Sequence, residues 1–182
     1  FASGFVKNKI LEFVGPGIAN LSMDYRIGID VMTTETTCLS SVWETDEKTR
    51  EYLAEHGREG DYTEMKIAGP AYYDGAVTID LSRVEPMIAL PFHPSNAYTI
   101  REFLADPLPI LEKVQEQGRK IKGDDSFTLT DKVRDGKVYV TQGIIAGCAG
   151  GGYENVAEAT EILRGKSVGT GEFALSVYPA SQ

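Results

Sequence analysis

The chain has few residues that could bind a metal or form covalent cross-links: its 182 residues include two cysteines and two histidines. Cys38 and Cys148 lie far apart in sequence, which excludes a disulfide scaffold and favours a reducing, cytoplasmic compartment. No histidine lies near enough to Cys148 in sequence to suggest a Cys–His pair, and no local pair of ligands indicates a zinc site.

Long apolar runs and basic stripes are also missing. No run approaches the length of a membrane span, and the first apolar stretch is too short and too interrupted, by Lys7 and Lys9, for a signal peptide. Acidic residues outnumber basic ones by 27 to 18, giving a net charge of −9. Neither nucleic acid nor an anionic membrane surface is therefore an expected partner. A small anionic substrate stays possible because a cleft can be locally positive.

Helix and strand patterns alternate along the chain. Helices are predicted at residues 5–15, 22–32, 45–57, 95–106, 108–123 and 153–165. Extended segments are predicted at 36–43, 76–81, 137–147 and 172–180, with a polar surface insertion at 123–137. Ser22 is a plausible N-cap, as is Thr45 or Asp46 for the third helix. The alternation predicts an α/β fold with a largely parallel sheet.

A glycine-rich turn, GCAGGG at residues 147–152, joins a strand to a helix. Free N–H groups at such a turn can bind an anion. The spacing does not match the dinucleotide fingerprint, and no Gly-Lys-Ser/Thr follows as in a Walker A loop. A tight turn in which a Cβ would clash is favoured over a nucleotide-binding module. Cys148 in this turn is either a small buried apolar residue or a thiolate favoured by a helix N-terminus, hence a nucleophile or a metal ligand.

Three stretches together resemble the aconitase and isopropylmalate isomerase family of 4Fe–4S hydro-lyases. Residues 11–43 (LEFVGPGIANLSMDYRIGIDVMTTETTCLSSVW) are similar to the family pattern EFxGPGxxxLSxxxRxxIxNMxxExGATxxxF. Residues 77–97 (VTIDLSRVEPMIALPFHPSNA) are similar to INLSxLxPxxxGPxxPDxA. Residues 147–163 (GCAGGGYENVAEATEIL) are similar to SCTNSxxEDxxxAAxIL. The three occur in the family's order, and the resemblance covers nearly the whole chain.

The resemblance implies a three-layer α/β/α architecture. It implies that residues 1–89 belong to the family's second α/β domain, truncated at its N-terminal side. Residues 90–182 would start the third domain, truncated at its C-terminal side. The chain starts at Phe1 without a Met and ends just after a strand-like run, so we expect an internal piece of a longer protein.

The resemblance also implies a chemistry. Cys148 falls on the family's first cluster-ligating cysteine, and Glu35 falls on the active-site glutamate near the open iron and its bound water. Gly150, Gly151 and Gly152 would let the backbone approach the cluster. The expected activity is the dehydration and rehydration of a hydroxy-polycarboxylic acid such as citrate or isocitrate, as in the tricarboxylic acid cycle. The remaining domains of the same protein would supply the other ligands and the substrate arginines.

Two departures from the family pattern support a different interpretation. Ala149 and Gly150 stand where the family has Thr-Asn, and Val31 stands where it has the Asn before the glutamate. The alternative is a non-catalytic α/β binding or assembly domain, in which Cys148 is buried and the glycines are purely steric.

Overall fold

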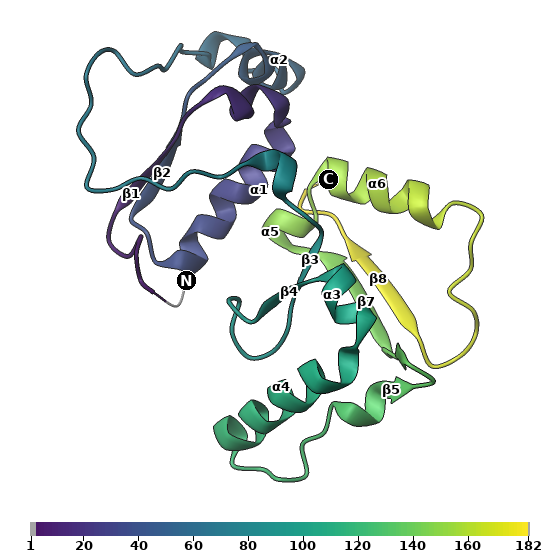
Figure 1. Cartoon of the computed structure of the whole chain (residues 1–182). Helices are drawn as coiled ribbons and strands as arrows, with labels where there is room; N and C mark the ends of the chain where they lie inside the picture. The colour runs from purple at the N-terminus through teal and green to yellow at the C-terminus, as the bar shows by residue number, and fades with distance from the viewer. Residues whose placement is uncertain (1–2, 182) are drawn as a thin grey trace.

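The computed structural model describes residues 3–181 (Figure 1). The described strands are β1 (Ile10–Phe13), β2 (Ser40–Trp43), β3 (Met87–Ala89), β4 (Ala97–Thr99), β5 (Val133–Arg134), β6 (Lys137–Val138), β7 (Gln142–Ala146) and β8 (Ala174–Tyr178). The α-helices are α1 (Met23–Thr33), α2 (Glu47–Glu55), α3 (Ile100–Ala105), α4 (Pro107–Lys122), α5 (Gly147–Gly150) and α6 (Tyr153–Leu163). Short 3₁₀ turns lie between them, including η2 (Thr34–Thr36) and η4 (Leu81–Arg83). Within this range no helix is long and apolar enough to cross a membrane.

Helices and strands mix along the chain, which confirms the predicted α/β class. The strand pairing within residues 3–181 is divided among four two-stranded sheets rather than gathered in one. The two longer pairs are parallel: β1 with β2, in the register Ile10 to Ser40, and β7 with β8, in the register Gln142 to Ala174. The two shorter pairs, β3 with β4 and β5 with β6, are antiparallel. Parallel pairing therefore holds where the strands are longest.

Two of the predicted elements are wrong. Residues 10–13 form β1 instead of belonging to a helix, and the Phe13 ring stacks on Trp43 of β2 with centroids 4.3 Å apart. Pairing with a distant strand thus overrides a local pattern that also fits a helix. Residues 76–80 form no strand, although they alternate, because no other segment pairs with them; Val77 and Ile79 are largely exposed.

The helix expected at 95–106 begins later than predicted. Residues 97–99 pair with β3, and Thr99 then caps α3 by accepting a hydrogen bond from the Glu102 N–H at 3.1 Å. Thr99 was not predicted as a cap, whereas two predicted caps are confirmed. The Ser22 hydroxyl accepts from the Tyr25 N–H at the start of α1, and the Asp46 carboxylate accepts from the Thr49 N–H at the start of α2.

The buried apolar core of the described residues is small and lies along α4. Its members are Leu90, Phe103, Leu111 and Val114. Partly buried side chains from β3, β4 and the β5–β6 hairpin pack against it. This core belongs to the second half of the chain. The first half meets the second where α1 packs against α5 (Figure 1).

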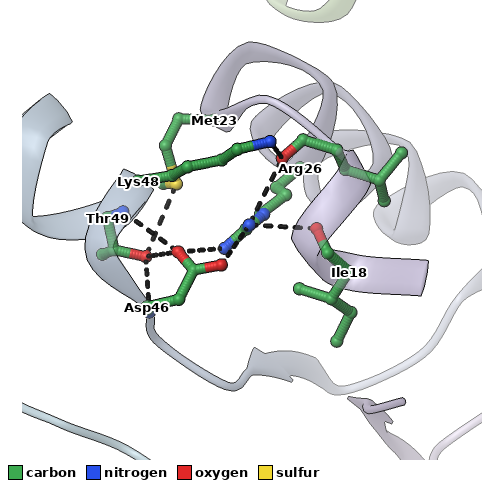
Figure 2. A network of polar contacts seen from close by, with 7 residues as sticks. Ile18, Met23, Arg26, Asp46, Lys48 and Thr49 are labelled. Carbon is green, nitrogen blue, oxygen red and sulfur yellow. Dashed lines mark hydrogen bonds and ion pairs between the residues drawn. The ribbon is translucent and has the colours of Figure 1, made fainter. Parts of the chain in front are cut away.

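A buried ion pair fixes α1 within the first half. The Arg26 guanidinium donates from Nη1 and Nη2 to the two carboxylate oxygens of Asp46, at 3.0 and 2.6 Å. Nη2 also donates to the carbonyls of Ile18 and Leu21. Because Asp46 also caps α2, one carboxylate ties the start of α2 to α1 (Figure 2).

Candidate functional site

The turn that carries Cys148 follows β7 directly. Gly147 takes a positive φ of 95°, which favours glycine, and begins the four-residue helix α5. Cys148 is the second residue of α5 and is exposed. Cys148 thus lies at a helix N-terminus, as expected, but the helix is the short α5, and the longer α6 begins only at Tyr153. The expectation of a buried Cys148 in a non-catalytic domain is contradicted, since this residue is exposed.

The three glycines after Cys148 differ in what surrounds them. A Cβ on Gly151 would meet the carbonyl oxygens of Gly147 and Tyr178 and the nitrogen of Ala180, all within 3.0 Å. Backbone atoms of the turn itself and of residues 178–180 thus surround Gly151, which confirms the tight-turn interpretation there. The Gly151 N–H itself donates to the Gly147 carbonyl. A Cβ on Gly150 would meet open space instead.

Gly152 is the N-cap residue of α6, and the N-terminus of this helix is already occupied by a carboxylate from α1. The Glu154 N–H in the first turn of α6 donates to Asp24 Oδ2 at 2.7 Å. The Ser22 hydroxyl donates to Glu154 Oε2. Helix N-termini attract negative charge, and here the chain's own Asp24 provides it. This arrangement argues against a phosphate cradle at the turn.

Glu35 lies at the other end of α1. It belongs to η2, which continues α1, and its carboxylate is exposed. With a rise of about 1.5 Å per residue, Glu35 lies roughly 16 Å along the helix axis from Asp24. The threonine hydroxyls on either side of it donate to carbonyls one turn back: Thr34 to Val31 and Thr36 to Thr33. Glu35 and the Cys148 turn are therefore connected through α1. The hydrogen bonds that join α1 to α6, however, lie at the N-terminal end of α1, and Glu35 follows its C-terminal end.

A polar cluster under the C-terminal half of α1 was not predicted from the sequence. Asp30 Oδ1 accepts hydrogen bonds from the Ser41 hydroxyl and from Trp43 Nε1. Thr33, which is buried, donates to the Asp30 carbonyl at 2.6 Å. The signal in the sequence was an acidic residue between Ile29 and Val31 on a largely apolar helix. This cluster joins the C-terminal end of α1, which η2 and Glu35 directly follow, to β2.

Two hollows of the described residues involve neither Cys148 nor Glu35. A hollow of about 310 Å³ lies beside α2, lined by residues that include Asp46, Arg50 and Lys66. Another of about 510 Å³ lies between residues 78–87 and Thr99. The candidate residues are instead on open surface, as expected for parts of a site that needs further protein to enclose it.

The donor set fits one corner of an iron–sulfur cluster. Such clusters are held by several cysteine thiolates. Within residues 3–181 no group of three potential metal ligands comes together. The exposed Cys148 thiol, next to the open space at Gly150, suits one ligand position. The other cysteine, Cys38, donates to the Thr33 carbonyl at 3.2 Å, beside β2. The chain therefore offers a single exposed cysteine, and any cluster would need ligands from outside it.

Comparison with known proteins gives consistent results over the whole chain. The family model described as "Aconitase family (aconitate hydratase)" matches residues 1–182. The 3-isopropylmalate dehydratase large subunit of Lachnoclostridium phytofermentans is 30% identical over 174 residues, 96% of this chain and 33% of that protein. The corresponding subunit of Acetivibrio thermocellus is 31% identical over 172 residues, with 94% and 33% covered. The 2,3-dimethylmalate dehydratase large subunit of Eubacterium barkeri is 31% identical over 171 residues, again with 94% and 33% covered. The chain thus spans about a third of the length of these relatives.

Proposed function

Because this chain belongs to the aconitase family, we propose that it is part of a hydro-lyase acting on a hydroxy-polycarboxylic acid. The observation that carries the proposal is the match of the family model to residues 1–182, together with relatives that are all named dehydratases. In the structure, the proposal is supported by an exposed Cys148 on a closely packed turn.

For the substrate, we propose an acid with a malate core, in which a hydroxyl and a removable hydrogen lie on adjacent carbons that carry carboxylates. The two kinds of relative are named for malates with alkyl substituents, isopropyl and dimethyl. The family description names aconitate instead, the unsaturated acid between citrate and isocitrate. The names of the relatives favour an alkyl-substituted malate over our original expectation of citrate or isocitrate. Both classes contain the same reacting carbons, so the choice depends on how the side group is bound.

We propose that Cys148 is one ligand of a 4Fe–4S cluster that is completed by residues outside this chain. When bound, such a cluster would supply a Lewis acid for the substrate hydroxyl and carboxylate. The chain's own contribution is to hold the thiolate on a rigid turn. Gly151 permits that turn because no side chain would fit among the backbone atoms around it.

For Glu35 we propose a proton-transfer role. Its exposed carboxyl group, in the protonated form, would donate its proton to the departing hydroxyl, which leaves as water. The resulting carboxylate would take a proton back from the water molecule that adds in the reverse, hydration direction. Its position is fixed through η2 and the Asp30 cluster, which ties this end of α1 to β2. The relatives are named large subunits. We therefore propose that further domains or a small subunit enclose Glu35 and Cys148 in one site.

The proposal is tested in the full-length protein, reconstituted anaerobically with iron and sulfide. The absorbance of the unsaturated acid is followed with 3-isopropylmalate, 2,3-dimethylmalate, citrate and isocitrate in turn. Turnover of one of these acids is expected. Glu35→Gln should lower kcat by about 10²-fold or more, the usual contribution of a positioned acid–base group. Glu116→Gln, on the exposed face of α4, is the matched control and should leave kcat unchanged. A folded, iron-loaded protein that turns over none of the four acids would favour the non-catalytic binding or assembly domain.

A further inference from the structure

We propose that Ser22 and Asp24, at the start of α1, are positioning residues that hold the Cys148 turn in place. The proposal rests on the proposed role of Cys148 and deepens it. It concerns two residues that are separated from Cys148 by more than 120 positions in sequence. We call the contacts of Ser22 and Asp24 with Glu154 the α1–α6 latch.

The latch consists of two hydrogen bonds that run between the first turns of two helices. Asp24 Oδ2 accepts from the Glu154 N–H at 2.7 Å, so a side chain of α1 caps the backbone of α6. The Ser22 hydroxyl donates to Glu154 Oε2 and accepts from the Tyr25 N–H, so it caps its own helix while holding the other. The Glu154 N–H lies in the first turn of α6, where backbone N–H groups have no partner within the helix, and Asp24 supplies one. The carboxylates of Asp24 and Glu154 also lie where the dipole of a helix N-terminus attracts negative charge.

Two further contacts hold the Cys148 turn, and the first of them connects it to the latch through α6. The Asn155 side chain, in the first turn of α6, donates from Nδ2 to the Ala149 carbonyl at 2.7 Å. The Gly151 carbonyl accepts from the Ala180 N–H, just after β8, at 2.9 Å. The residue after Cys148 is thereby tied to α6, and the end of the turn is tied to the sheet. If α6 moves, the carbonyl next to Cys148 moves with it.

The geometry around Cys148 itself explains why these contacts matter. The thiol is exposed, and α5 has only four residues. Its direction is therefore set by the backbone of the turn rather than by close packing of its side chain. A metal ligand has to be held within a fraction of an ångström of its productive position. Together with the packing of α1 against α5, the latch holds this turn against the half of the chain that carries Glu35.

The proposal predicts a local effect of Asp24→Ala. We expect amide hydrogen exchange in residues 147–152 of the full-length apoprotein to speed up roughly fivefold, the factor that corresponds to a lost helix cap. Asp24→Asn keeps an acceptor oxygen and should stay close to the wild type. Thr99→Ala is the matched control, because Thr99 caps α3 with a similar 3.1 Å hydrogen bond but does not contact α6 or the turn. It should leave exchange at 147–152 unchanged.

A second measurement tests the consequence for the ligand. In reconstituted protein, the visible cluster absorbance should decay roughly fivefold faster in Asp24→Ala than in Asp24→Asn when an iron chelator is added. Unchanged exchange at 147–152 in Asp24→Ala would overturn the latch, and so would equal acceleration in Thr99→Ala. If the wild type forms no cluster but the exchange results hold, the latch stands and the proposed function fails. If the wild type forms a cluster that Asp24→Ala retains equally well, with unchanged exchange, the function stands and the latch fails.

Discussion

Replacing Asp46 with Asn removes one charge from the ion pair that holds α1 and α2 together. Asn is as good an N-cap as Asp, so the start of α2 keeps its cap and the change isolates the ion pair. The Arg26 side chain is only 3% exposed, and its Nε already lacks a hydrogen-bond partner among the described residues. After the substitution, the buried guanidinium would keep the Ile18 and Leu21 carbonyls as its charge-stabilising partners.

The expected size follows from the burial of the two partners. Leaving one member of a buried ion pair alone costs about 3–5 kcal/mol. The Asp46 side chain is 34% exposed, so water can approach the vacated position and reduce this penalty. We expect a loss of about 2–3 kcal/mol in the local unfolding free energy of α1 and α2. Arg26→Met combined with Asp46→Asn should recover part of that loss, because no buried charge then remains.

Amide hydrogen exchange of peptides covering α1 and α2, in the full-length protein, measures this local free energy. Arg58→Ala is the control, because Arg58 pairs with Asp61 just after α2 and both side chains are more than half exposed. It should change exchange by less than about 0.5 kcal/mol. Two results would refute the reasoning: equal effects of Asp46→Asn and Arg58→Ala, or a double variant at least as destabilised as the sum of the two single ones.

Three further predictions concern the same chain. The Arg26 guanidinium, mainly by hydrogen bonding, holds the pKa of Asp46 below its usual range. The stability that this carboxylate contributes is therefore present above pH about 4, and it is lost as the pH falls through the lower pKa of the folded state. The difference in protection between wild type and Asp46→Asn should therefore shrink below pH about 4; a difference that grows instead would contradict this sign. Gly151→Ala places a Cβ against three backbone atoms and should destabilise the turn by about 1–3 kcal/mol. Gly150→Ala faces open space and should leave thermal unfolding unchanged. Equal melting temperatures of the two variants would show that the turn is not closely packed. Gln115→Leu on α4 leaves the Thr130 N–H and hydroxyl without their Oε1 acceptor and should lower the stability by about 1–3 kcal/mol. Gln115→Glu keeps an acceptor oxygen and should lower it less. Hydrogen exchange of residues 127–133 that is faster in Gln115→Glu than in Gln115→Leu would exclude this role of Gln115.

Local signals in the sequence predicted the starts of α1 and α2. Ser22 and Asp46 were identified as possible caps, and both accept hydrogen bonds from the N–H groups that a cap should satisfy. These contacts span only three residues, so sequence spacing alone determines which groups meet. The turn at 147–152 was also predicted as sterically tight, and Gly151 shows the backbone contacts that require a glycine.

Pairing between distant segments could not be predicted in the same way. The apolar residues at 10–14 fit a helix as well as a strand, and only pairing with residues 40–43 decides for β1. The alternation at 76–81 fits a strand, but a strand needs a partner, which the local sequence does not supply.

The same limit applies to the candidate site. The turn at 147–152 was noticed from its glycines, but the roles of Cys148 and Glu35 were assigned only through a family resemblance, and the latch was not found at all. Asp24 reads locally as an ordinary first-turn acid, and its contact with Glu154 spans 130 residues. A side chain that accepts a hydrogen bond from the backbone of a different helix leaves no periodic pattern in the sequence of either segment. Such contacts emerge only when the two halves of the chain are seen together (Figure 1).

The most direct test of the central claim compares the two cysteines of this chain as cluster ligands. Full-length wild type, Cys148→Ser and Cys38→Ser are reconstituted anaerobically with iron and sulfide, and bound iron and visible cluster absorbance are measured for each. Cys148→Ser should lose the cluster absorbance, because serine does not supply the thiolate. Cys38→Ser should keep it, since Cys38 donates to the Thr33 carbonyl beside β2 and serine can do the same. A Cys148→Ser protein that keeps its full cluster absorbance would contradict the assignment of Cys148.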